Sequence, residues 1–157
     1  MMMNYSEYKK DLQRIHESEV YGCAVFHMAA QVTLNPKRKK KWLVLKDLEV
    51  QTLERYLAYM KDSGQAVIEP KGWALKGYAE GAALGVLPWP ISMRLLRNAT
   101  RPFQEKFLRL KNNATQESDK KFFGYVYAHE KALESFAQKE LSRDQNSLKA
   151  VESLLSN

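Results

Sequence analysis

The sequence has few of the features that build disulfide-linked, membrane-spanning or sheet proteins. Cys23 is the only cysteine among 157 residues, so no internal disulfide can form and a reducing cytoplasm is the expected compartment. Glycine and proline number only 7 and 5, and β-branched residues are sparse, which favours helix over sheet. No apolar run approaches the roughly 20 residues needed for a transmembrane segment, and the polar N-terminus does not resemble a signal peptide.

Apolar residues make up 45% of the chain, enough for one domain with a substantial core. Apolar side chains recur at helical spacing in four long segments, which predicts four main helices of about 20 to 25 residues. The sequence therefore predicts a single all-α domain over 1–157, an up-down four-helix bundle with short accessory helices. The expected main helices are 8–33, 36–62, 91–112 and 118–142, and the expected accessory helices are 73–87 and 144–155.

Local signals place the ends of these helices. Residues 1–7 are expected to form a loose lead-in, with Ser6 capping the first helix. Asn35-Pro36 ends that helix, because the residue before a proline avoids the α region. Pro102 is expected to kink the third main helix. The segment 65–72 is expected to be a loop, since no second strand is available to pair with it.

Three of the four main helices carry a glutamate in the apolar stripe that should face the core. Glu19 follows Leu12 and Ile15 at helical spacing, and Glu49 and Glu130 occupy equivalent places in later helices. An unpaired charge in a core is costly. A proton, a hydrogen-bond partner, a cation or a metal is therefore expected beside each of these carboxylates.

The helices that carry these glutamates resemble the metal-binding helices of the ferritin-like superfamily. Glu19 to Phe26 places an aromatic residue seven positions after a glutamate, as in the first helix of that family. The stretches around Glu49 and around His129-Glu130 are similar to its second and fourth helices. Members bind two metals through one Glu on each of two helices and a Glu-x-x-His on each of the other two. The resemblance covers roughly residues 8–141.

This chain departs from the family pattern at both expected Glu-x-x-His motifs. Thr52 stands where histidine would follow Glu49, and Leu133 stands where histidine would follow Glu130. The third helix follows a Gly-rich segment, as it does in quinone-hydroxylase members of the family. Its ligand would be Gln104 or Glu105, or this helix would provide no ligand. A regular helix directs Glu105 to solvent, opposite the apolar stripe.

The resemblance implies a metalloprotein that holds iron or manganese, with Glu19, Glu49 and Glu130 as ligands. His129 would be the nitrogen donor or a second-layer partner, and the activity would be that of an oxidoreductase using oxygen or peroxide. Tyr56 and Tyr127 could carry hydrogen bonds or electrons. Catalytic residues are not identified by the sequence, and no cofactor is expected if the site is degenerate.

The alternative is a metal-free bundle that acts as a binding or assembly module. The glutamates would then form a buried polar network with nearby tyrosines, Thr52 or His129, while His16 and His27 would be at the surface or partly buried. A homodimer is compatible with either hypothesis. The +7 net charge is concentrated in one basic cluster that could touch nucleic acid, anionic lipid or an acidic partner, although a solvated helix start is the favoured interpretation. The cluster consists of Lys37, Arg38, Lys39, Lys40 and Lys41.

Overall fold

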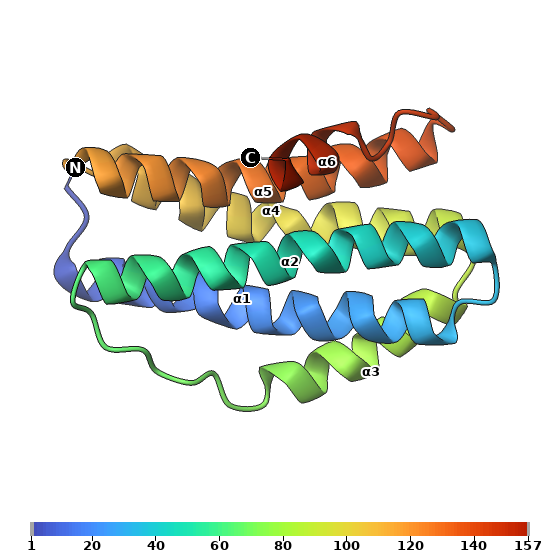
Figure 1. Ribbon diagram of the computed structural model, residues 1–157, viewed down its shortest axis with the longest axis horizontal. Helices are drawn as coiled ribbons and strands as arrows, with labels where there is room; N and C mark the ends of the chain where they lie inside the picture. Colours follow the sequence, from blue (N-terminus) through green and yellow to red (C-terminus); the bar gives the residue numbers. More distant parts are fainter. Residues whose placement is uncertain (1, 157) are drawn as a thin grey trace.

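The computed structural model describes residues 2–156, which form helices and contain no strand. Figure 1 shows the long helices running lengthwise beside one another, with α3 (Trp73–Val86) lying along α1 (Tyr5–Val32) and α6 (Lys149–Leu155) lying against α5 (Glu117–Leu141). The all-α prediction is confirmed. Within this described range no helix combines the length and apolarity needed to cross a membrane. The helices are α1 (Tyr5–Val32), α2 (Pro36–Asp62), α3 (Trp73–Val86), α4 (Trp89–Asn113), α5 (Glu117–Leu141) and α6 (Lys149–Leu155).

The first helix begins earlier than the sequence analysis predicted. Asn4, not Ser6, is the N-cap: its side chain accepts a hydrogen bond from the Glu7 backbone N–H at 2.9 Å. The Glu7 carboxylate accepts in return from the Asn4 backbone N–H at 3.2 Å. This reciprocal capping box satisfies two otherwise unpaired donors, so the expected loose lead-in over 1–7 is wrong beyond Asn4.

One further expectation about helix ends needs correction. The last helix starts at Lys149 rather than at residue 144, because the Asp144 side chain accepts from the Asn146 backbone N–H at 2.8 Å and holds a turn. Pro102 lies inside α4, which runs from Trp89 to Asn113, and the kink expected at this proline stays a prediction. The segment 65–72 is a connection without strand, as predicted.

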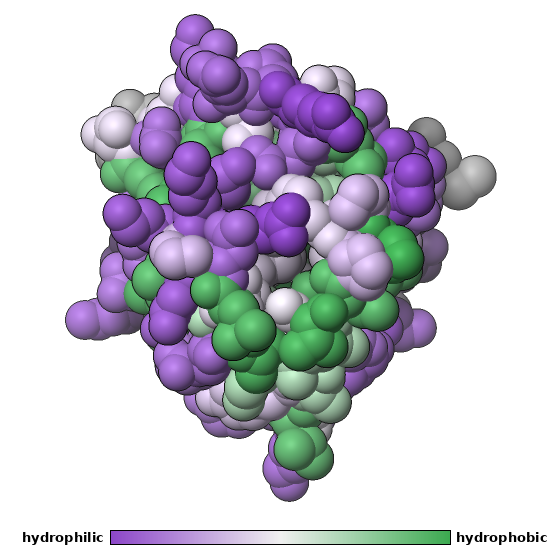
Figure 2. All heavy atoms as spheres, turned by 90° about the vertical axis from the view of Figure 1, so that its right-hand side faces the viewer, coloured by the Kyte–Doolittle hydropathy of each residue, from purple (hydrophilic) through white to green (hydrophobic). Residues whose placement is uncertain are grey.

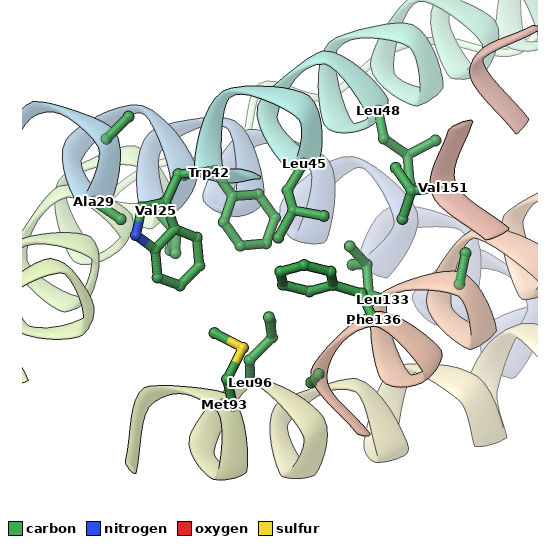
Figure 3. Close-up of a cluster of buried hydrophobic side chains, with 14 residues drawn as sticks. Val25, Ala29, Trp42, Leu45, Leu48, Met93, Leu96, Leu133, Phe136 and Val151 are labelled. Atoms are coloured by element: carbon green, nitrogen blue, oxygen red, sulfur yellow. The ribbon is translucent and has the colours of Figure 1, made fainter. Parts of the chain in front are cut away.

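The core consists of two apolar clusters separated along the helices by polar residues. The first includes Trp42, Leu45 and Phe136, whose side chains converge from different helices in Figure 3. The second includes Tyr56 and Phe107. Along α2, the residues between Leu45 and Tyr56 that face the core include a glutamate and a threonine. The bundle therefore places Glu49 and Thr52 between the two apolar clusters.

Three glycines bring α3 into backbone contact with α1. Gly77, Gly81 and Gly85 recur every four residues and form one stripe of the helix. A Cβ atom built on Gly81 would lie 2.3 Å from the carbonyl oxygen of Val25, and one on Gly77 would lie 2.5 Å from that of Tyr21. The absence of side chains at this stripe is what allows the close approach.

Replacing Gly81 by alanine should therefore destabilise the protein, although alanine is the better helix former by about 1 kcal/mol. The added methyl group meets backbone that cannot rotate away, and overpacking of this kind costs roughly 1 to 3 kcal/mol. Urea unfolding of Gly81→Ala measures the change. An equal or higher stability would show that α3 moves freely on α1. Gly124→Ala in α5 provides a comparison, because the added Cβ would meet only the flexible end of Lys111, at 3.9 Å.

Candidate metal centre

Three buried side chains from three helices converge at the middle of the bundle. Glu19 of α1, Glu49 of α2 and His129 of α5 each offer a ligand atom, and these atoms lie within 4.8 Å of one another. His129 Nε2 is 3.2 Å from Glu49 Oε1, and its Nδ1 is 3.8 Å from Glu19 Oε2. Three of the four residues named from the sequence as metal ligands are thus brought together.

The fourth, Glu130, is buried but is not a member of that group of three. It faces a cavity that also reaches Glu49. Burial, opposed by His129 and reinforced by the nearby Glu19 carboxylate, raises its pKa to about 8. Glu19 and Glu130 therefore interact in the interior, and neither carboxylate lies in open solvent.

The protonation of the other two carboxyls reflects the same enclosure. Burial raises the pKa of Glu49 to about 8, with a further contribution from Glu130. Burial also raises the pKa of Glu19 well above its usual range, and the Glu49 carboxylate adds to this effect. Carboxyls with such raised pKa values are held partly as neutral acids near pH 7, and a nearby cation would return them to the ionised form.

A threonine hydroxyl orients the imidazole. Thr52 Oγ1 lies 2.7 Å from His129 Nδ1 and 2.8 Å from the hydroxyl of Tyr125. The Gln51 side chain donates to the Tyr125 oxygen at 2.9 Å and to the Leu154 carbonyl at 2.9 Å. This chain of hydrogen bonds connects the histidine to α6 through Tyr125. With Nδ1 held by Thr52, Nε2 is the imidazole nitrogen directed to the Glu49 carboxylate.

The donor set suits a divalent transition metal. Carboxylate oxygens together with an imidazole nitrogen are ligands that iron and manganese accept. Glu19 Oε2 has no hydrogen-bond partner within residues 2–156, although it is fully buried. A buried carboxylate oxygen without a partner is costly, and a cation bound by Glu19, Glu49 and His129 would satisfy it.

A mostly apolar cavity of about 340 Å³ borders the carboxylates. It lies where α1, α3 and α4 meet. Its polar lining residues are Ser18, Tyr21, Glu49, Glu80, Thr100 and Glu130. At one side the Tyr21 hydroxyl donates to the Glu80 carboxylate, which links α1 to α3. The apolar residues that line the cavity are Val25, Phe26, Ala83, Leu84, Leu87, Leu95, Leu96, Ala99, Phe103 and Leu133.

The third main helix of the sequence analysis, now α4, adds no ligand to the group formed by the described residues. Glu105 is exposed, as its position opposite the apolar stripe predicted. Gln104 instead donates to Thr100 Oγ1 and to the Glu134 carboxylate, both at 3.0 Å. Neither Gln104 nor Glu105 therefore belongs to the group formed by Glu19, Glu49 and His129.

Two other polar residues discussed from the sequence, His16 and Tyr56, lie outside this group of three. His16 is buried rather than at the surface, with its ring 4.9 Å from that of Tyr56, and burial lowers its pKa. The Tyr56 hydroxyl makes no hydrogen bond within residues 2–156. Tyr125 was missed as a site residue, yet it precedes His129 by four positions, which is the spacing that puts two side chains on one helix face.

Gly22 makes room for the Glu49 carboxylate. A Cβ atom at position 22 would lie 2.5 Å from both Cδ and Oε2 of Glu49. The glycine is one helical turn from Glu19 on α1, so the two residues share the face that meets α2. The sequence shows a glycine in the stripe but not the side chain that fills its place.

Gly22→Ala should consequently displace the Glu49 carboxylate while every ligand residue is retained. We expect the affinity for Mn²⁺ to fall on the order of 10- to 100-fold, as for other changes that disturb the orientation of a ligand. The free energy of unfolding in chelator should change little, because the flexible end of Glu49 can move toward the cavity. Calorimetric titration with Mn²⁺ measures the affinity, and an unchanged value would contradict a role for Glu49 as a ligand.

Comparison with models of known protein families, with curated proteins and with solved structures gives no match to this chain. Its function is therefore inferred from the arrangement of its own side chains. The decisive feature of that arrangement is that Glu19, Glu49 and His129, separated by up to 110 positions in sequence, present ligand atoms to one point.

Proposed function

We propose that this protein is a ferritin-like metalloprotein that binds iron or manganese and acts as an oxidoreductase. The observation that supports this most strongly is the convergence of Glu19, Glu49 and His129, all buried, within 4.8 Å of one another inside the bundle. The helices that provide these residues are those in which the sequence resembles ferritin-like proteins. The proposed site is simpler than the family pattern, with a threonine where the second helix would provide a histidine.

The roles of the chain's own residues follow from their positions. Glu19, Glu49 and His129 would hold the ion, which when bound would supply redox chemistry toward oxygen or peroxide. Thr52 fixes the orientation of His129. Glu130, at the edge of the cavity, could hold or release a proton close to neutral pH, since its pKa is about 8. The apolar walls keep bulk water from the site and suit an apolar substrate.

A second function is supported by the same contacts. Both nitrogens of His129 already have neighbours, Thr52 at 2.7 Å and Glu49 at 3.2 Å. Three carboxyls with raised pKa values could remain neutral and belong to a polar network without metal. In that case the protein would be a helical module for binding or assembly, and the hydrogen bonds of the network would only specify how the core packs.

The direct test of the proposed function is the metal content of the protein. Protein purified without chelator should contain close to one iron or manganese ion per chain by elemental analysis, and the chelated protein should take up Fe²⁺ or Mn²⁺ at that stoichiometry under anaerobic conditions. Iron-loaded protein should then consume oxygen faster than the chelated form. Protein that takes up neither ion would overturn the proposal and leave the binding module.

Thr52→His tests the likeness to the ferritin-like pattern. Position 52 is one turn after Glu49, fully buried, and already in contact with His129, so an imidazole there would add the missing nitrogen donor. We expect a higher affinity for Fe²⁺ and Mn²⁺ than in the wild type, despite an overpacking cost of roughly 1 to 3 kcal/mol in chelator. Thr52→Val, which keeps the volume but removes the hydroxyl, should instead weaken binding. A loss of affinity in both variants would contradict the proposed likeness at this helix.

A further inference from the structure

One end of the molecule exposes an apolar surface. It is formed by the turn between α1 and α2 and by the junction of α3 with α4, and in Figure 2 it is the group of green residues on the face toward the viewer. Leu34 is 97% exposed and Val86 is 70% exposed. The two segments are in contact, since the Thr33 hydroxyl donates to the Gly85 carbonyl at 3.3 Å. The exposed apolar side chains here are Leu34, Val86, Leu87, Ile91 and Leu95.

The basic cluster borders this apolar surface. Four exposed basic residues stand in the first turns of α2, starting three positions after Leu34: Lys37, Arg38, Lys39 and Lys40. The Arg38 guanidinium lies 5.1 Å from the ring centroid of Trp89 at the start of α4. Lys41, in contrast, is paired with Glu140 at 2.7 Å. The end of the bundle thus combines a protruding leucine and valine with four basic side chains that make no ion pair among the described residues.

We propose that this end of the protein docks on the surface of an anionic lipid bilayer. Apolar side chains on turns can enter the boundary between headgroups and acyl chains, and lysine and arginine beside them are attracted to anionic headgroups. Leu34 and Val86 would make the apolar contacts, and the residues 37–40 would make the electrostatic ones. The two kinds of contact lie on adjacent segments, so one orientation of the bundle engages both.

The charge of this end argues against a second copy of the chain as the occupant. A two-fold contact through the apolar surface would place two sets of exposed basic residues near each other. Repulsion between them would oppose the gain from apolar burial. A nucleic acid would match the positive charge, but it would leave Leu34 and Val86 exposed without a partner. An anionic lipid surface complements both the charge and the apolar side chains.

The experiment is flotation of the protein with vesicles of phosphatidylglycerol and phosphatidylcholine, compared with vesicles of phosphatidylcholine alone. The wild type should bind the anionic vesicles and bind the neutral ones far less. Attraction to an anionic surface is worth roughly fivefold in partitioning per basic residue, so replacing the four residues 37–40 by glutamine should lower partitioning about 100-fold or more. The double variant Leu34→Ser, Val86→Ser should also lower it, by at least about tenfold.

Matched variants separate docking at this end from general adsorption of a basic protein. The first control replaces four exposed lysines from the opposite end, Lys9, Lys10, Lys61 and Lys121, by glutamine. The second, Ile68→Ser with Leu75→Ser, removes apolar side chains that are 66% and 75% exposed elsewhere. Both controls should bind anionic vesicles nearly as the wild type does, and circular dichroism checks that all variants are folded.

Several outcomes would overturn the proposal. The first is that the wild type does not bind anionic vesicles, and the second is that control and test variants lose binding equally. The third is that binding depends on the charges but not on Leu34 and Val86. Sedimentation of the lipid-free protein provides a further check. A dimer that dissociates in the Leu34→Ser, Val86→Ser variant would assign the apolar surface to a second copy of the chain instead. These measurements need no metal, so they are independent of the proposed redox activity.

Discussion

In the presence of chelator, the protein should become less stable as the pH rises from 6.5 to 8, and saturating Mn²⁺ should remove or reverse that trend. The groups responsible are Glu49 and Glu130, whose pKa values are about 8 in the folded chain. Glu19, with a pKa also raised well above its usual range, contributes in the same direction. In the unfolded chain these carboxyls ionise near pH 4.3.

The sign follows from proton binding. Between the unfolded and folded pKa values, the folded protein binds more protons than the unfolded chain, so raising the pH favours unfolding. Each extra proton held by the folded state lowers the free energy of unfolding by about 1.4 kcal/mol per pH unit. For the two protons of Glu49 and Glu130, the loss between pH 6.5 and 8 is at most roughly 4 kcal/mol. His16, whose pKa is lowered by burial, acts in the opposite direction, but mainly below its ordinary pKa of about 6.5, so it offsets only a small part of the loss in this interval.

A bound metal ion should invert this dependence. Metal ligation requires ionised carboxylates and a neutral imidazole, so the apparent affinity rises with pH. An ion that binds only the folded state adds stability according to its concentration relative to Kd. Thermal unfolding at several pH values, once in chelator and once in Mn²⁺, measures how Tm depends on pH in each condition. In chelator, Tm is expected to fall on the order of 10 °C between pH 6.5 and 8. Parallel curves would show that the buried carboxyls bind no metal.

The sequence was sufficient to predict the helices and the unusual carboxylates. Helical periodicity placed the four long helices within a few residues of their observed ends, because amphipathic spacing is a local property. Glu19, Glu49 and Glu130 were recognised as buried because each interrupts an apolar stripe. The error at the first helix arose from choosing Ser6 as the cap, when Asn4 and Glu7 form the complete capping box.

The details of the site depend on contacts that no local pattern encodes. Thr52 looked like a missing histidine, and only the packing of α2 against α5 shows that its hydroxyl meets His129 Nδ1. Gly22 looked like a small residue in a stripe, and its function in accommodating Glu49 appears only when the two helices are placed together. Likewise His129 was named from the sequence as a nitrogen donor or second-layer partner, and only the packed helices show that it is fully buried between Thr52 and Glu49.

Replacing the buried glutamates one at a time should weaken Mn²⁺ binding to different extents. The effect of Glu49→Gln on stability should also reverse its sign when Mn²⁺ replaces the chelator. Glu49→Gln and Glu19→Gln should each weaken Mn²⁺ binding more than 100-fold, beyond the roughly 10- to 100-fold range typical of outer-layer changes. Glu130→Gln should weaken Mn²⁺ binding by an amount within that roughly 10- to 100-fold range, because Glu130 borders the group of three without belonging to it. Glu105→Gln, on the exposed face of α4, is the matched control and should bind as the wild type does.

Stability should respond to these substitutions in opposite directions with and without metal. In chelator at pH 8, Glu49→Gln should be more stable than the wild type, because glutamine has nearly the shape of the neutral acid and cannot ionise in the core. In saturating Mn²⁺ the same variant should be less stable than the wild type, since it forgoes the stabilisation by the bound ion. Urea unfolding of Glu49→Gln and Glu105→Gln under both conditions provides the comparison. If Glu49→Gln shifts stability equally with and without Mn²⁺, the carboxylate belongs to a polar network, and the metal centre proposed here does not exist.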